Sequence, residues 1–276
     1  MPAVSDASDR IQRLLALESK GRDRFEAVTP SDGPGRLFGG QVAAQSLRAA
    51  TLTVDESRPP HSFHAYFVRP GRPGVPLVLD VIRIRDGRSF TTRAVTATQG
   101  GEAIFFLAAS FHSPEEGEDW QLPARDDIPG PDDVDATRSP LAQFESMMPF
   151  ELRPAAGRSQ MGFALHPFWV RVGGTLPDDP QLHACALAFI SDMGVVGSAR
   201  PNVADMRAFM GASLDHAVWF HRPFRADEWL LFDVGPVSNY GARGLARGTM
   251  HTADGVLVAS IQQEALLRPT GTVPLP

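Results

Sequence analysis

The sequence predicts an α+β protein made of two copies of one unit, a buried helix followed by an antiparallel meander of strands. Two alanine-rich runs, residues 42–50 and 183–192, are apolar almost all round, which is typical of buried helices. Each run is followed by strand-like segments that glycine-containing turns separate. A repeat at one sequence offset connects the two units.

The repeat is clearest between residues 61–70 and 211–223. Pro70 and Pro223 lie 153 residues apart. The same offset aligns Tyr66 with Trp219, Phe67 with Phe220, Arg69 with Arg222, Asp80 with Asp233, and Ser110 with Gln263. A shared offset across separate segments, with aromatic residues in register, indicates a duplication. We therefore expect the sheets of the two units to form one continuous surface, because each copy can supply a partner for an edge strand of the other.

The elements of the first unit follow from local patterns. Residues 5–19 have helical spacing, and residues 24–28 form a short strand candidate. Gly39 and Gly40 begin the helix at 42–50 and leave backbone N–H groups at the positive end of its dipole. Strand-like runs follow at 61–68, 77–85, 90–98 and 103–109.

Residues 113–149 separate the two units. This stretch is rich in proline and acidic residues and has no periodicity, which indicates an exposed linker. We therefore expect an N-terminal domain at 1–112, the linker at 113–149, and a C-terminal domain at 150–276. The second unit has strand candidates at 168–172, 213–221, 229–234, 242–250 and 256–264.

Charge, hydropathy and cysteine content limit the partners and the location that we expect for this protein. The net charge is −6 without a basic cluster, which disfavours a nucleic-acid partner. No apolar run approaches the roughly 20 residues that cross a bilayer, so we expect no membrane partner. Cys185 is the single cysteine, and the first residues lack a signal pattern, so we expect a reducing, cytoplasmic location. Cys185 itself lies in an apolar helix and is expected to be a buried structural residue.

Three polar residues of the second unit are candidates for chemistry. Asp192 ends an apolar helix, which is the unfavourable end of the dipole for a carboxylate. Ser213 lies on the next predicted strand, with Asp215 on the same face and His216 on the other. Gln263 lies on the last strand. A carboxylate can take a proton from water, and a hydroxyl and an amide can hold that water.

Motifs in both units resemble one family. In the first half these are Leu37-Phe38-Gly39-Gly40-Gln41 and the segments 61–71, 85–90 and 109–111. In the second half they are Ile190-Ser191-Asp192 and the segments 213–223 and 254–264. In this order they are similar to acyl-CoA thioesterase II, over nearly the whole chain except the first residues and the linker.

The resemblance implies a double hot-dog fold, in which two long helices are each wrapped by a curved antiparallel sheet. It implies hydrolysis of fatty acyl-CoA to free fatty acid and CoA. We expect no cofactor, and we expect no metal because the strand spacings of His61 with His64 and of His216 with His221 put each pair on opposite faces. The family's catalytic aspartate and glutamine correspond to Asp192 and Gln263. Its threonine corresponds to Ser213, which keeps the hydroxyl and loses a methyl group. The resemblance also suggests a homo-oligomer, a dimer or a tetramer.

Four further residues are candidates for contacting the substrate. Gly39 and Gly40 are candidates for holding an oxyanion, and Arg243 and Arg247 for contacting the phosphates of CoA, because arginine matches phosphate geometry. Ser213 remains a rival nucleophile, with Asp215 on its predicted face. A non-catalytic acyl-CoA-binding or sensing protein remains the alternative function, although all three polar positions are occupied.

Overall fold

The structure is a computed structural model that describes residues 7–29, 35–134, 148–155, 166–200 and 209–270. Its helices are α1 (Ala7–Leu15), α2 (Gly39–Thr51), α4 (Pro180–Ile190) and α5 (Val195–Ser198). The strands of the first half are β1 (Leu17–Gly21), β2 (Arg24–Ala27), β3 (Pro60–Phe67), β4 (Leu77–Asp86), β5 (Phe90–Gln99) and β6 (Glu102–His112). Those of the second half are β7 (Phe150–Pro154), β8 (Phe168–Val172), β9 (Phe209–Ser213), β10 (Asp215–Phe220), β11 (Leu230–Tyr240), β12 (Arg243–Thr252) and β13 (Leu257–Pro269).

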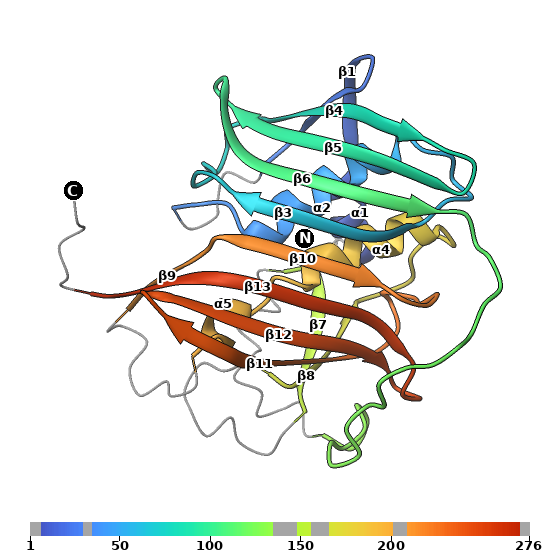
Figure 1. The fold of residues 1–276 in the computed structure, drawn as a ribbon, viewed down its shortest axis with the longest axis vertical. Helices are drawn as coiled ribbons and strands as arrows, with labels where there is room; N and C mark the ends of the chain where they lie inside the picture. Colours follow the sequence, from blue (N-terminus) through green and yellow to red (C-terminus); the bar gives the residue numbers. More distant parts are fainter. Residues whose placement is uncertain (1–6, 30–34, 135–147, 156–165, 201–208, 271–276) are drawn as a thin grey trace, which may run out of the picture.

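The strands of both halves form one antiparallel sheet (Figure 1). Its order is β1-β2-β4-β5-β6-β3-β10-β13-β12-β11-β8-β7, and β9 pairs with β13 beside this path. The halves meet where β3 pairs with β10, with His64 opposite Ala217. Each half thus covers an edge strand of the other, which removes two unpaired sheet edges. The continuous sheet and the predicted α+β class are both confirmed.

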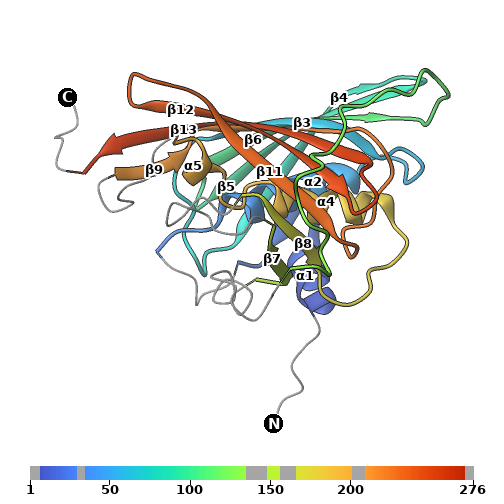
Figure 2. The same cartoon turned by 90° about the horizontal axis from the view of Figure 1, so that it is seen from below.

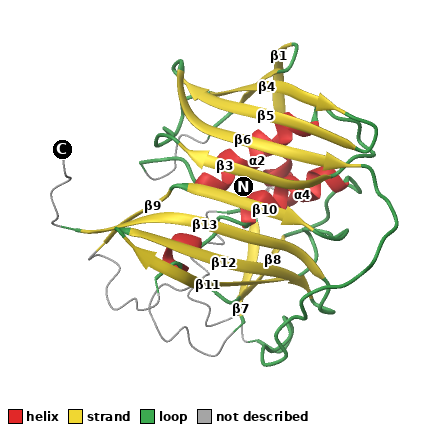
Figure 3. Ribbon diagram, viewed as in Figure 1, coloured by secondary structure: helices red, strands yellow, loops and turns green. Residues whose placement is uncertain are grey.

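The two central helices lie side by side on one face of the sheet (Figures 2 and 3). Nearly every residue of α2 and of α4 is buried, as their apolar sequences predict. Alanines such as Ala43, Ala44 and Ala186 are completely buried, and their small side chains let helices approach closely. Asp179 caps the N-terminus of α4, and its carboxylate accepts hydrogen bonds from the backbone N–H groups of Gln181 and Leu182.

Two predicted element boundaries differ from the structure. The helix expected over 5–19 ends at Leu15, and Leu17 already belongs to β1. Leu17 fits the apolar spacing of the helix, yet it is only partly buried against the core. The helix expected over 183–192 ends at Ile190, so Asp192 lies just beyond it. In the part of the chain that the structure describes, no helix is long and apolar enough to cross a bilayer.

The strand predicted over 213–221 is interrupted at Leu214, between β9 and β10. Ser213 lies opposite Ala265 of β13, whereas Ala217 lies opposite Gln262. The segment from Ser213 to Ala217 therefore contains one residue more than the facing segment of β13, from Gln262 to Ala265. Such an extra residue is a β-bulge, and it inverts the alternation of side chains beyond it.

This bulge corrects the predicted faces of three side chains. His216 was expected on the face opposite Ser213, but it is completely buried on the inner side of β10. Asp215 was expected beside Ser213, but its carboxylate accepts the backbone N–H of Glu264 at 2.6 Å. Asp215 thus satisfies a ladder donor at the bulge, and it is not hydrogen-bonded to Ser213.

The strand registers also correct one pair of the repeat. Ala246 lies opposite Gln263 in β12–β13, and Arg93 lies opposite Ala109 in β5–β6. Arg93 and Ala246 are related by the offset of 153, so the counterpart of Gln263 is Ala109 and not Ser110. The β12–β13 hairpin holds one residue more than its counterpart. Since side chains alternate along a strand, this one residue decides which side chain faces inward.

The described part of the linker, 113–134, is a loop with mostly exposed side chains, fastened to the second half. Arg222 forms an ion pair with Asp119, and Gln121 donates to the carbonyl of Gly255 at 2.8 Å. Trp169 donates to the carbonyl of Pro129 at 3.0 Å. Residues 135–147 of the linker lie outside the described part of the chain.

Candidate active site

Asp192 is buried between the C-terminal end of α4 and the N-terminus of α2, with 7% of its surface exposed. The backbone N–H of Gly40 is one of its hydrogen-bond partners. The end of its own helix is unfavourable for a carboxylate, but the N-terminus of α2 supplies a donor and the positive end of a dipole. A helix of the first half thus stabilises the charge of a residue from the second half.

Ser213 and Gln263 lie beside Asp192. The Ser213 hydroxyl is 3.4 Å from Oδ1 of Asp192, and Nε2 of Gln263 donates to the Ser213 oxygen at 2.8 Å. Gln263 also hydrogen-bonds to the Asp192 carboxylate. The structure therefore brings together the three residues that the sequence predicts as catalytic, from a helix end and from two strands that pair with each other.

Burial raises the pKa of Asp192 from 3.8 to about 6. Hydrogen bonds from Gln263, Gly40 and Ser213 oppose this increase, and so does the charge of Arg36. The carboxylate is ionised at neutral pH, and it is more basic than an exposed aspartate. A general base works best when its pKa lies near the operating pH. The arrangement can thus remove a proton from a water molecule next to Asp192.

The lack of side chains at Gly39 and Gly40 lets the N-terminus of α2 lie close to Asp192 and Phe189. A Cβ atom at Gly39 would lie 2.7 Å from Oδ2 of Asp192 and 2.6 Å from the Phe67 ring. A Cβ atom at Gly40 would collide with the backbone oxygen of Phe189. The predicted oxyanion-binding glycines therefore stand at the site. The Gly40 N–H, however, already donates to Asp192.

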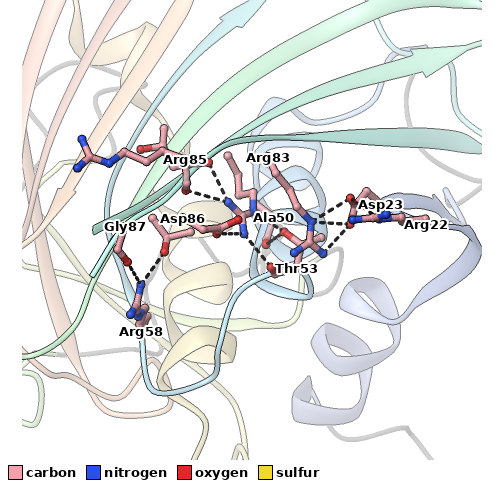
Figure 4. A network of polar contacts seen from close by, with 12 residues as sticks. Arg22, Asp23, Ala50, Thr53, Arg58, Arg83, Arg85, Asp86 and Gly87 are labelled. Atoms are coloured by element: carbon pink, nitrogen blue, oxygen red, sulfur yellow. Dashed lines mark hydrogen bonds and ion pairs between the residues drawn. The ribbon is translucent and has the colours of Figure 1, made fainter. Parts of the chain in front are cut away.

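The corresponding place in the first half is filled differently. Thr53 stands two residues beyond α2, as Asp192 stands two residues beyond α4. The guanidinium of Arg93, whose side chain is 1% exposed, donates to the hydroxyl and carbonyl of Thr53 and to the Asp86 carboxylate. Figure 4 labels these two partners within the network of polar contacts. The position equivalent to the glutamine is Ala109. The first half thus has neither the carboxylate nor the amide, and a buried arginine takes their space.

The two predicted phosphate-binding arginines do not lie with the trio. Along β12, Ala246 is buried beside Gln263, whereas Arg243 and Arg247 are exposed on the opposite face. Nε of Arg243 donates to the Glu264 carboxylate at 2.8 Å. Both side chains therefore point away from the inner face of the sheet.

Sequence reasoning missed two residues near the site. Arg36 is exposed, donates to the carbonyl of Gly211 at 3.2 Å, and lowers the pKa of Asp192 through its charge. Its place directly before the Leu37–Gln41 motif was an available signal. His216 was assigned to the wrong face, because nothing in the sequence indicates the bulge at Leu214.

The fold and this site define a double hot-dog protein with a buried carboxylate site where its two halves meet. The chain belongs to the acyl-CoA thioesterase family. The model of the acyl-CoA thioesterase N-terminal domain matches residues 29–112, and that of acyl-CoA thioesterase matches residues 142–266.

Individual proteins and solved structures are also similar to this chain. Acyl-coenzyme A thioesterase 8 of Mus musculus is 36% identical over 260 residues, which cover 84% of this chain and 80% of that protein. The crystal structure of acyl-CoA thioesterase II TesB2 from Mycobacterium marinum has a TM-score of 0.81 and 39% identity, covering 95% of this chain and 99% of that one. A hot-dog protein of unknown function from Alicyclobacillus acidocaldarius, 20% identical with a TM-score of 0.74, has the same fold and covers 96% of this chain and 99% of that one.

Proposed function

We propose that this chain hydrolyses acyl-CoA thioesters to the free fatty acid and CoA, with Asp192 as the general base. The observation that carries the proposal is the buried Asp192 carboxylate, whose pKa is raised to about 6 and which is hydrogen-bonded to Gln263 and Ser213. Family membership supports the same reaction. No observation favours a protein that binds acyl-CoA without turnover.

The proposed mechanism is a direct attack by water. Ser213 and Gln263 hold a water molecule beside Asp192, about 3 Å from the thioester carbon. The water oxygen bonds to the carbonyl carbon while Asp192 accepts its proton, directly or through Ser213. The tetrahedral intermediate then collapses, the carbon–sulfur bond breaks, and the CoA thiolate leaves and regains a proton. The N–H of Gly39, at the N-terminus of α2, is the proposed donor to the thioester oxygen.

A covalent acyl-Ser213 intermediate is the rival mechanism. A serine nucleophile needs a base within hydrogen-bond distance. Asp215, the predicted candidate, is hydrogen-bonded to Glu264, and the hydrogen bond from the Ser213 hydroxyl to Asp192 is long, at 3.4 Å. These distances favour water over Ser213 as the nucleophile. Detection of an acylated Ser213 by mass spectrometry after rapid quenching would decide for the rival.

We further propose that arginines bind the phosphates of CoA. Arg243 and Arg247 stay candidates, reached from the outer face of β12, and Arg36 joins them because it is exposed beside the site. Guanidinium groups bind phosphate through paired N–H donors. Replacing each arginine by glutamate should raise KM for acyl-CoA where the contact exists and leave KM unchanged where it does not.

Three broader proposals accompany the reaction. The first is a division into domains at 1–112 and 150–276, with the 113–149 segment between them. The second is assembly into a dimer or a tetramer, which the exposed apolar side chains Tyr66, Ile82 and Phe106 on the outer sheet face support. The third is a cytoplasmic location, which the single buried Cys185 supports, because its thiol forms no disulfide within the chain.

The test is a series of acyl-CoA esters of increasing chain length, assayed for release of the CoA thiol. Turnover of at least one chain length, with the free acid as product, is the expected result. Saturable binding of acyl-CoA without thiol release across the series would instead support the binding or sensing protein.

A further inference from the structure

His216 is a buried imidazole that takes no part in the proposed hydrolysis. It is 0% exposed, and its Nε2 lies 2.7 Å from the Ser191 hydroxyl. The β10–β13 register, in which Ala217 lies opposite Gln262, places His216 next to Gln263 one step along the strands. Inward-facing neighbours of this kind have Cβ atoms about 5 Å apart. The imidazole therefore stands beside the amide that binds Ser213.

Two buried atoms of this pair lack a hydrogen bond of good geometry, Nδ1 of His216 and Oε1 of Gln263. Buried polar atoms nearly always have a partner. An amide oxygen can only accept, whereas an imidazole nitrogen can donate, so the two atoms are complementary. Interaction with Gln263 also favours the protonated form of His216, although burial lowers the pKa of His216 to about 4 overall. The ring is thus neutral at pH 7, and only one of its two nitrogens carries a hydrogen.

The position of that hydrogen determines the direction of a chain of donors. With hydrogen on Nδ1, His216 donates to Oε1 of Gln263, and the opposite end of the amide donates to Ser213 at 2.8 Å. Ser213 then has its own hydrogen free for Asp192. With hydrogen on Nε2, two acceptors would face each other unless the amide turned over. A reversed amide would take the Ser213 hydrogen away from Asp192.

We propose that His216 is a positioning residue for the hydrolysis, whose Nδ1–H holds the Gln263 amide with its Nε2 directed at Ser213 and Asp192. This inference rests on the proposed roles of Asp192, Ser213 and Gln263. The Ser191 hydroxyl has one hydrogen and two acceptors within reach, the carbonyl of Ala188 at 2.9 Å and Nε2 of His216 at 2.7 Å. In the proposed arrangement this hydrogen goes to Nε2 of His216 and not to the Ala188 carbonyl. Each group from Ser191 to Ser213 then donates to the next one toward the carboxylate.

The first experiment compares two replacements of the imidazole. His216→Asn keeps an amide donor near the place of Nδ1, whereas His216→Phe keeps a ring of similar shape and has no donor. We expect His216→Phe to lower kcat about tenfold, the effect of one buried hydrogen bond, with KM little changed. His216→Asn should keep most of the activity. The matched control is His251→Phe, which replaces another buried histidine of the sheet and should leave kcat unchanged.

A double-mutant cycle separates positioning from a structural role. If His216 acts through Gln263, then His216→Phe should cause no further loss of kcat in a Gln263→Ala background. An equal loss in both backgrounds would overturn the proposal. Absence of thiol release from every acyl-CoA would reject the proposed function, and full turnover of Asp192→Asn would reject the proposed role of Asp192. A normal Asp192→Asn defect together with additive His216 and Gln263 effects would reject only the positioning role.

The second experiment uses the unaltered protein. Long-range ¹H–¹⁵N spectra of histidine-labelled protein report which ring nitrogen carries the hydrogen, and the His216→Asn spectrum identifies the signal by its loss. The expected result at pH 7 is a neutral imidazole protonated at Nδ1. A signal with the hydrogen on Nε2 would contradict the proposed chain of donors.

Discussion

At the residue scale, the site depends on one carboxylate that is kept buried at a cost in stability. Asp192 has no arginine or lysine within ion-pair distance among the described residues. Its partners are an amide, a hydroxyl and a backbone N–H, and the charge of Arg36 acts from farther away. These groups hold the carboxylate in place without making it a weak base.

The pKa of Asp192 predicts how activity depends on pH. The base must be ionised, and burial raises its pKa from 3.8 to about 6. We expect kcat/KM for acyl-CoA to be constant above about pH 7 and to fall tenfold for each pH unit below about 6. Initial rates across a pH series in buffers of constant ionic strength test this. A plateau that continues to pH 4 would exclude Asp192 as the titrating base.

The same shift predicts that Asp192→Asn stabilises the protein. The pKa of Asp192 is higher in the folded chain than in the unfolded chain, so the folded protein binds the proton more tightly between about pH 4 and 6. The ionised side chain therefore destabilises the fold above pH 6, by up to about 3 kcal/mol. Urea unfolding should show Asp192→Asn to be more stable than the original chain at pH 8. The difference should shrink toward zero at pH 4, and a pH-independent difference would contradict this account.

At the element scale, the close approach of α2 to Asp192 requires glycine. A Cβ atom at Gly39 would lie 2.7 Å from the Asp192 carboxylate, whereas one at Gly35 would have no atom within 4 Å. We therefore expect Gly39→Ala to lower kcat by at least tenfold, because it displaces Asp192 or Phe67. Gly35→Ala is the matched control and should keep its activity. Equal kcat values for the two variants would show that the tight contact has no role in turnover.

The elements themselves were largely predictable, because periodicity and turn residues indicate them locally. The buried helices and the strands at 77–85 and 168–172 appear close to their predicted limits. The bulge at Leu214 was not predictable, because it arises from pairing with β13, a partner about 50 residues away. That single residue also determined the faces of Asp215 and His216. Errors in the candidate site therefore came from strand register and not from element type.

At the scale of the whole molecule, duplication explains the continuous sheet. The repeat predicted one continuous sheet, which the β3–β10 pairing confirms. Resemblance to a family placed Asp192, Ser213 and Gln263 together. The contact of Asp192 with α2 joins the two halves, and no local pattern could reveal it. At the corresponding place of the first half Arg93 is buried, and the helix of that half supports the site of the other half through Gly40.

Assembly is the prediction that concerns the outer face of the sheet. Tyr66 and Phe106 pair across β3 and β6 and are 60% and 39% exposed, and Ile82 on β4 is 57% exposed. We expect light scattering at micromolar concentration to give at least twice the chain mass of 29.9 kDa. Ile82→Asp should shift the mass toward the monomer, since burying an unpaired charge is costly. A mass of one chain for the unaltered protein would reject a homo-oligomer.

The central claim is that water attacks the thioester with Asp192 as its base, and the most direct test is the turnover of Asp192→Asn. Asparagine has nearly the same shape but cannot accept the proton, so we expect kcat for acyl-CoA to fall about 10²-fold or more. KM should change little, and the variant should remain folded. An Asp192→Asn variant with full turnover would contradict the mechanism.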